Sequence, residues 1–326
     1  SDTIVQTDGP NAWSINGTNS GTVTDLTTGT FTNIENLTGG TGVDTFTFAP
    51  AGTLSGAIHA GAGLDEIIGD EDGNAFIVNA TNAGVLTGKL SGFTSVENLT
   101  GQDADDTFTI NANLTGSITG AGGLDTIVVA ANVTVTGSID AGAGNDSITL
   151  GANSTVTGTV NGGADSDTLL LQTIAADVGL TALDAMGADG TATGITGGFT
   201  DLETIHAASG DTLTGLNETN TWALDGSPTY SDAGPEILNF SGFANLQGGT
   251  DTDEFNVTAA TTANLKGGAG VDTFNIDAAL TGTINGEGGA DVLDLVTLVT
   301  AHVALTGSNA DGFAGTATSV SGGFDG

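Results

Sequence analysis

The sequence lacks cysteine and arginine and contains very few cations of any kind. Of its 326 residues, two are Lys and 39 are Asp or Glu, so the formal net charge is −37 at pH 7. Without cysteine, neither disulfides nor thiolate metal sites can hold the fold together. Without a basic surface, the chain cannot neutralise phosphates, which excludes a nucleic-acid binder.

Long apolar runs are also missing. No run approaches the roughly 20 residues that a helix needs to cross a bilayer, so we expect no membrane insertion by this segment. The first residues, SDTIV, have neither the basic nor the apolar region of an export signal. We therefore expect an export signal to lie elsewhere, in a longer protein of which this chain is a segment.

What the chain does contain favours strands and turns. Glycine accounts for 54 residues and apolar residues for 38% of the chain, which is enough to fold. Threonine, valine and isoleucine prefer strands, whereas the residues that build amphipathic surface helices are scarce. We predict an almost all-β protein.

One phrase recurs along nearly the whole chain: a Gly-rich turn, an Asp and an alternating strand. GGTGVDTFTF begins at Gly39 and GGAGVDTFNI at Gly267. The short spacings between these register aspartates are 19 to 21 residues, and the long gaps are near multiples of them. The repeat unit is therefore about 20 residues. The register aspartates are Asp44, Asp65, Asp106, Asp125, Asp146, Asp167, Asp253, Asp272 and Asp291.

A second phrase lies between these turns, for example LTGSI from Leu114 and LTGTI from Leu280. Each unit thus holds two short strands and two turns, too little to bury its own apolar face. Stacked copies give a continuous core in which each strand pairs with the next coil. We predict a parallel β-helix, or β-solenoid, right-handed and with about 20 residues per coil. Alternating residues such as Phe46 and Phe48 should point inward.

Repeats longer than one coil also occur in the sequence. TATGITGGF from Thr191 and TATSVSGGF from Thr316 are 125 residues apart, and phrases like FTNIENLTGG from Phe31 mark module starts. We predict one continuous solenoid over residues 1–326, with modules at roughly 1–70, 71–215 and 216–326. Residues 169–199 and 293–324 should fold as equivalent coils.

The Gly-rich turns suggest a metal. The residues from Gly39 to Thr47 and from Gly267 to Asn275 match the nonapeptide of calcium-binding RTX β-rolls, which this edge resembles. That resemblance implies Ca²⁺ held by Asp carboxylates and carbonyls of stacked turns. RTX nonapeptides run in tandem, however, whereas here one copy occurs per coil, so we do not expect a complete RTX roll.

Some turns carry additional carboxylates, which makes them stronger candidates for Ca²⁺. The candidate ligands are Asp44, Asp65, Asp103, Asp105, Asp106, Asp125, Asp146, Asp165, Asp167, Asp251, Asp253, Asp272 and Asp291. The alternative is that each register Asp only accepts hydrogen bonds from turn amides.

Enzymatic function is an alternative that the residues disfavour. Polysaccharide-degrading enzymes occur on right-handed β-helices, but hydrolysis needs a pair of non-repeating carboxylates, and here nearly every carboxylate is periodic. His59, His206 and His302 occupy unrelated places, as solvated turn residues would, and show no metal-ligand spacing. No Gly-x-Ser-x-Gly elbow is present. We therefore expect no catalytic residues and no enzyme.

Surface binding to ice or glycans is the other alternative. Threonine precedes glycine in many coils, but this gives one row rather than the paired array of an ice-binding face. Trp13, Trp222 and Tyr230 could stack on sugars where the coils loosen. We expect these aromatic residues to fill the core instead.

The Gly/Asn/Thr/Asp coils, the ENLTGG phrase and the duplicated modules together resemble the β-helical shafts of secreted bacterial adhesins. The nearest families are the filamentous-haemagglutinin type, exported by two-partner secretion, and biofilm-matrix adhesins. The resemblance covers essentially the whole chain. It implies a structural shaft at the bacterial cell surface or in the extracellular matrix that mediates cell-surface, cell–cell or biofilm attachment. Its partners would be exopolysaccharide, a cell-surface glycan or protein, and neighbouring segments of the same chain.

Overall fold

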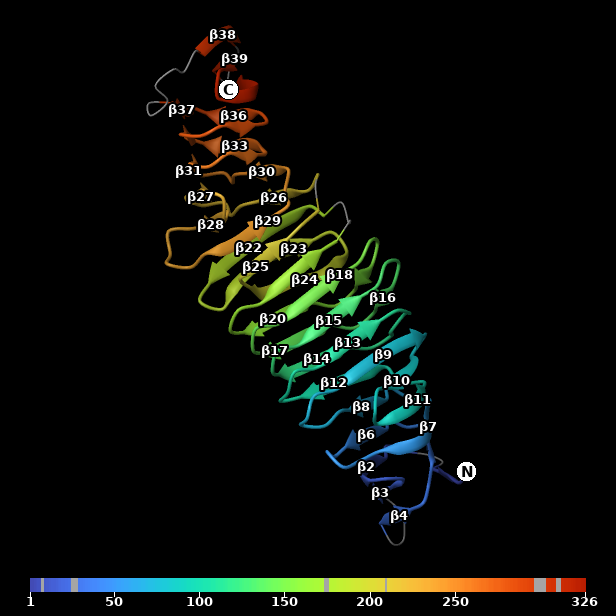
Figure 1. Ribbon diagram of the computed structural model, residues 1–326. Coiled ribbons are helices and arrows are strands. Elements are labelled where there is room, and N and C mark those ends of the chain that lie inside the picture. The colour runs from blue at the N-terminus through green and yellow to red at the C-terminus, as the bar shows by residue number, and fades with distance from the viewer. Residues whose placement is uncertain (7–8, 25–28, 173–175, 209, 296–302, 309–311) are drawn as a thin grey trace. The chain divides into compact units, whose positions relative to one another are not determined.

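The computed structural model describes residues 1–6, 9–24, 29–172, 176–208, 210–295, 303–308 and 312–326 (Figure 1). Every regular element in this part of the chain is a β-strand, which confirms the all-β class. None of the described segments forms a helix long and apolar enough to span a membrane. The chain divides into two compact units, Ser1–Leu170 with Gly194–Gly198, and Leu171–Thr193 with Phe199–Gly326.

The first unit contains short strands joined by tight turns. They are β1 (Thr3–Val5), β2 (Ala12–Gly17), β3 (Ser20–Val23), β4 (Thr30–Thr32), β5 (Asn36–Gly40), β6 (Thr45–Phe48), β7 (Leu54–Gly61), β8 (Glu66–Ile68), β9 (Ala75–Ala80), β10 (Ala83–Leu86), β11 (Leu90–Thr94), β12 (Asn98–Gln102), β13 (Thr107–Ile110), β14 (Ile118–Gly122), β15 (Thr126–Val129), β16 (Thr134–Val135), β17 (Ile139–Ala143), β18 (Ser147–Leu150), β19 (Thr155–Val156), β20 (Val160–Ala164) and β21 (Thr168–Leu171).

The second unit is built in the same way, and β21 and β24 each contribute residues to both units. Its strands are β22 (Val178–Asp184), β23 (Gly187–Ala192), β24 (Ile195–Leu202), β25 (Thr204–His206), β26 (Thr212–Thr214), β27 (Asn220–Leu224), β28 (Thr229–Ser231), β29 (Leu238–Ser241), β30 (Asn245–Gln247), β31 (Asp253–Val257), β32 (Thr261–Thr262), β33 (Asn264–Gly270), β34 (Thr273–Ile276), β35 (Leu280–Thr281), β36 (Ile284–Gly289), β37 (Val292–Asp294), β38 (Val303–Ser308), β39 (Phe313–Ala317) and β40 (Val320–Asp325).

Parallel stacking dominates both units and confirms the parallel β-helix. In the first unit, β13 pairs with β15 and β15 with β18, so that Phe108, Ile127 and Ile148 are successive partners (Figure 1). In the second unit, Phe255 of β31 pairs with Phe274 of β34, and their rings stack with centroids 5.0 Å apart. The handedness and the coil length stay predictions.

The core follows the alternation along each strand. Phe46 and Phe48 are both buried, as predicted, while the threonine between them is half-buried. Trp13, Trp222 and Tyr230 are also buried, which confirms the core role over an exposed stacking surface. The apolar residues of successive coils therefore form continuous stacks, and their burial stabilises each coil against the next.

Antiparallel pairing interrupts the parallel stacking at the module starts. Strands β2, β3 and β4 pair antiparallel, as do β9, β10 and β11, and β27, β28 and β29. The first turns of the first two meanders contain Asn19 and Asn82, both with positive φ, a conformation that asparagine tolerates. Short local turns favour antiparallel pairing of such a meander. The periodicity of about 20 residues by itself favours parallel stacking of coils.

The predicted duplication holds at the level of strand pairing. In the antiparallel pair β22 and β23, Val178 faces Ala192; in β38 and β39, Val303 faces Ala317, each 125 residues later. The register shifts after Leu180 in the first pair and at the equivalent place in the second. This confirms equivalent folding for the described strands; residues 173–175, 296–302 and 309–311 lie outside the described part.

The module-start phrases have a packing role that the sequence left unexplained. A glycine in the middle strand of a meander lies against the carbonyl of the preceding strand and under the phenylalanine of the phrase. A Cβ on Gly84 would lie 2.0 Å from the carbonyl oxygen of Ile77 and 2.8 Å from Cζ of Phe93. The same pattern recurs at Gly21, where the ring belongs to Phe31. In these two meanders the phenylalanine of the phrase therefore packs on the glycine of the middle strand.

We expect Gly84→Ala to destabilise the chain by about 2–3 kcal/mol, because neither the backbone nor the buried ring can move away easily. Gly92→Ala in the adjacent β11 is the matched control, since the nearest atom to its Cβ would be 3.8 Å away. Urea unfolding of the two variants measures the difference. Equal stabilities would show that the glycine does not lock the meander.

The aspartate ladder as candidate functional site

The register aspartates are joined from coil to coil by a repeated hydrogen bond. The carboxylate Oδ1 of one Asp accepts the backbone N–H of the Asp in a neighbouring coil. The N–H of Asp44 donates to Asp65 at 2.7 Å, that of Asp106 to Asp125 at 2.7 Å, and that of Asp253 to Asp272 at 2.8 Å. We call this arrangement the aspartate ladder. The ladder adds a contact between coils to the predicted capping of the residue's own turn, which occurs at Asp253, where Oδ2 accepts the backbone N–H of Gly249 at 2.8 Å.

The ladder forms three runs rather than one edge. The runs are Asp44 with Asp65; Asp106, Asp125, Asp146 and Asp167; and Asp253, Asp272 and Asp291. In the first unit, Asp65 precedes β8, which pairs with β12, whereas Asp106 precedes β13, which pairs with β9. The prediction of one shared edge is therefore wrong within this unit. The meander β9 to β11 lies between the two runs in the sequence, and its strand β9 pairs with β13.

Asparagine begins each run, a role that sequence analysis missed. The side-chain amide of Asn11 donates to Oδ1 of Asp44 at 2.7 Å, and that of Asn220 donates to Asp253 at 2.9 Å. Asn74 donates to Asp106 in the same way. Each asparagine stands two residues before the aromatic residue that opens a meander, and this spacing could have identified it. A neutral amide thus replaces the next carboxylate where a run starts.

The second carboxylate oxygen is enclosed by the fold. At Asp65, Asp125 and Asp272, Oδ2 is buried and has no hydrogen-bond partner. It faces the residue five positions earlier: a Cβ on Gly120 would lie 2.1 Å from Oδ2 of Asp125. An unpaired buried carboxylate oxygen is costly when charged, so the ladder favours the protonated acid.

Burial accordingly raises the pKa of several ladder carboxyls. Desolvation is the main cause, and the neighbouring carboxylates of the run add to it. It raises the pKa of Asp65, Asp106 and Asp272 to about 6. It raises the pKa of Asp125 to about 7, with Asp146 and Asp106 as the nearest charges. Hydrogen bonds from backbone amides oppose these shifts without cancelling them.

The other candidate ligands lie outside the ladder. Asp103, Asp105, Asp165 and Asp251 are exposed on the turns, whereas Asp291, the last member of the third run of the ladder, is half-buried. Oδ1 of Asp105 accepts the backbone N–H of Leu124 at 2.8 Å. Across the described residues, no three Asp, Glu, His or Cys side chains come together in a way that could hold a metal ion. A cation at these turns would therefore depend on the exposed carboxylates and on carbonyl oxygens.

A buried ion pair also escaped sequence analysis. Lys89, one of two lysines in the chain, contacts the buried carboxylate of Asp70 and donates to the carbonyl of Pro50 at 2.6 Å. A lone lysine in a strongly acidic sequence was the feature that could have identified this ion pair. The pair ties the β10–β11 turn to the loop before β9.

The histidines differ from their expected turn positions. His59 lies on β7 and His206 on β25, both exposed, and Nδ1 of each is 2.6 Å from a hydroxyl of the neighbouring strand, Thr94 and Ser241 respectively. Both histidines occupy equivalent positions on the outward faces of their strands. His302 lies outside the described residues.

Calcium binding at the turns stays a prediction. If Ca²⁺ binds the exposed carboxylates, millimolar Ca²⁺ should raise the melting temperature and a chelator should lower it, because binding to the folded state stabilises it. Asp103→Asn combined with Asp105→Asn should remove that response, with Mg²⁺ as the ionic-strength control. A melting curve that responds to neither Ca²⁺ nor chelator would reject calcium.

No protein-family model matches the chain, and no curated protein matches it significantly.

Proposed function

We propose that this chain is a structural segment of a secreted bacterial adhesin, attaching cells to surfaces, to one another or to exopolysaccharide. The aspartate ladder is the observation that supports this most. The most regular polar residue of the repeat bridges coils, as Asp125 does between Asp106 and Asp146, and is buried there. Residues repeated for coil-to-coil contact suit a shaft, in which each coil mainly supports its neighbours.

The surface composition supports the same role. A formal net charge of −37 with two lysines opposes self-association in bulk and keeps the surface solvated. The large aromatics Trp13, Trp222 and Tyr230 are in the core. The proposed partners are exopolysaccharide, a cell-surface glycan or protein, and neighbouring segments of the same chain. The proposed location is the cell surface or extracellular matrix, reached by two-partner secretion.

The proposal is tested by retention and by product release. Beads coated with the chain should stay on films of bacterial exopolysaccharide or on bacterial cells under flow several-fold better than beads coated with an unrelated all-β protein of similar charge. Incubation with uronate, glucan and chitin polymers should release no new reducing ends. Equal retention of both bead types would overturn the attachment role, and release of oligosaccharides would favour the polysaccharide-degrading alternative.

A further inference from the structure

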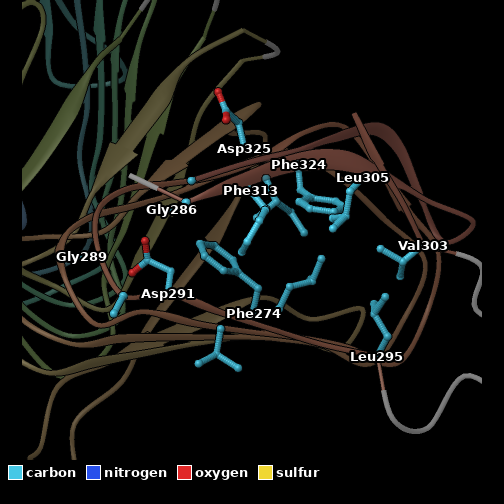
Figure 2. Close-up of a pocket in the computed structure, with 16 residues that line it drawn as sticks. Phe274, Gly286, Gly289, Asp291, Leu295, Val303, Leu305, Phe313, Phe324 and Asp325 are labelled. Atoms are coloured by element: carbon cyan, nitrogen blue, oxygen red, sulfur yellow. The ribbon is translucent and has the colours of Figure 1, made fainter. Parts of the chain in front are cut away.

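A cavity of about 790 Å³ lies beside β34 and β36 to β40 and is lined mainly by apolar residues. Figure 2 shows Phe274, Phe313 and Phe324 around it. Apart from Asp291 and Asp325, its described lining residues are apolar or glycine. Such a lining presents no hydroxyl, amine or amide side chain that could react. Polar side chains without a structural task lie elsewhere, at the tips of the antiparallel meanders.

Two meanders carry an exposed asparagine at the same place. Asn16 lies three residues after Trp13 in β2, and Asn79 lies three residues after Phe76 in β9. The residues on either side of Asn16 pair with β3, and the register shifts at Asn16 itself. The register of β9 with β10 shifts at Asn79 in the same way. Each asparagine is thus the extra residue of a β-bulge, which turns its side chain away from the ladder of the strand.

The fold does not use either of these side-chain amides. Asn16 and Asn79 are both exposed, and the described residues supply no hydrogen-bond partner for their side chains. The next asparagine of the second turn differs, because Nδ2 of Asn82 donates to Oγ1 of Thr115 at 2.7 Å. Nδ2 of Asn16 and of Asn79 is therefore free to react.

Each free asparagine begins the same kind of tripeptide: Asn-Gly-Thr from Asn16 and Asn-Ala-Thr from Asn79. An asparagine followed two residues later by threonine or serine is the acceptor sequence for N-linked sugars. Thr81 is exposed, whereas Oγ1 of Thr18 accepts a hydrogen bond from Thr53 at 3.2 Å. Asn79 is therefore the more accessible acceptor of the two.

Two further tripeptides of this type are used in packing. Asn36 and Asn98 each begin Asn-Leu-Thr, but both are half-buried. Nδ2 of Asn36 donates to the carbonyl of Asp2 at 3.2 Å, and Oδ1 of Asn98 accepts the N–H of Ser117 at 3.0 Å. A sugar on either asparagine would displace these contacts. The fold thus separates the tripeptides into free and engaged ones.

We propose that Asn79 and Asn16 are acceptors for an N-linked sugar. In this reaction Nδ2 of the asparagine attacks C1 of a sugar that is carried by a nucleoside diphosphate. The Nδ2–C1 bond forms and the bond between C1 and the phosphate oxygen breaks. The nucleoside diphosphate leaves with that electron pair, and one Nδ2 proton passes to a base of the transferase. Because the bulge faces solvent, the attached sugar leaves the coils undisturbed.

Peptide mapping by mass spectrometry tests this after incubation of the folded chain with UDP-glucose and a purified soluble asparagine glucosyltransferase. Asn79 should gain a hexose, Asn16 should gain it several-fold more slowly, and Asn36 and Asn98 should stay unmodified. No hexose on Asn79, or equal modification of Asn79 and Asn98, would overturn the proposal. In peptides excised from the unmodified chain, Asn98 should react at a rate comparable to Asn79. If it did not, the fold would not be what selects the acceptor.

A loss of the hydroxyl residue separates the tripeptide from mere exposure. Thr81→Ala keeps Asn79 in place but should abolish its modification, whereas Thr81→Ser should retain it. Residue 81 is exposed in a turn, so both variants should fold, and far-UV circular dichroism checks this. Modification of Asn79 that persists in Thr81→Ala would contradict the proposed acceptor.

The third meander offers a matched gain of an acceptor. Its equivalent position, three residues after Trp222, is Asp225, and Ser227 already stands two residues later. Asp225→Asn completes the tripeptide, and its amide oxygen keeps accepting the N–H of Ser227, as Oδ1 of Asp225 does at 3.0 Å. Pro228→Ala is added to relax the chain after the tripeptide. This double variant should gain a hexose that Pro228→Ala alone does not, and its failure to do so would overturn the role of the meander tip.

Discussion

Acidification from pH 8 to about pH 4 is expected to stabilise this protein. The ladder carboxyls have pKa values raised from 3.8 to about 6 at Asp65, Asp106 and Asp272 and to about 7 at Asp125. A raised folded pKa means that the folded state holds protons that the unfolded chain has released. The resulting stabilisation is complete below about pH 3.8 and is lost as the pH rises through 6 to 7. One such carboxyl contributes about 3 kcal/mol, and neighbours in a run are coupled, so their contributions do not simply add.

Urea unfolding at several pH values measures this dependence. The high negative charge of the surface also favours acid, so each pH series is repeated at about 0.5 M NaCl, which screens exposed charges much more than buried ones. If the ladder carboxyls cause the pH dependence, most of the change in unfolding free energy should remain at about 0.5 M NaCl. An unfolding free energy that falls on acidification between pH 8 and 4, or a dependence that salt abolishes, would show that the ladder does not hold protons.

Asp125→Asn is expected to change stability in a direction that depends on pH. In the variant the side-chain amide oxygen still accepts the N–H of Asp106, as Oδ1 of Asp125 does at 2.7 Å in the native protein. The neutral amide avoids the free-energy cost of an ionised carboxylate packed against Gly120. At pH 8 the variant should be more stable than the native protein by about 1–3 kcal/mol, because the native carboxyl is then ionised without a partner for Oδ2. At pH 4 the native carboxyl is protonated, so the gain should vanish.

Two further variants make this prediction sharp. Asp125→Ala removes the acceptor and should cost about 2 kcal/mol at pH 4, since the buried N–H of Asp106 loses its partner. Asp103→Asn is the matched control at an exposed turn and should change stability by less than about 0.5 kcal/mol at either pH. If Asp125→Asn destabilised the protein equally at both pH values, the second oxygen would have to have a partner that stabilises its charge.

The sequence by itself determined the repeating architecture. Spacings of 19 to 21 residues between register aspartates, together with alternation at positions such as Phe46 and Phe48, require stacked strands, because so small a unit can bury its apolar side chains only against another copy. The equivalence of β22 and β38 was also readable, since a duplicated phrase folds alike in a like environment. The importance of the register Asp was evident, although its chemical use was not.

Tertiary structure alone decided how the register carboxylates are used. Whether Asp125 faces a cation, its own turn or a neighbouring coil depends on which strands stack beside it, and local sequence does not encode that. The meander β9 to β11 lies between the two runs of the ladder in the first unit, and its turns at Asn82 and Gly88 reverse the chain. Burial then follows from stacking: the pKa of Asp125 rises because coils on both sides exclude water.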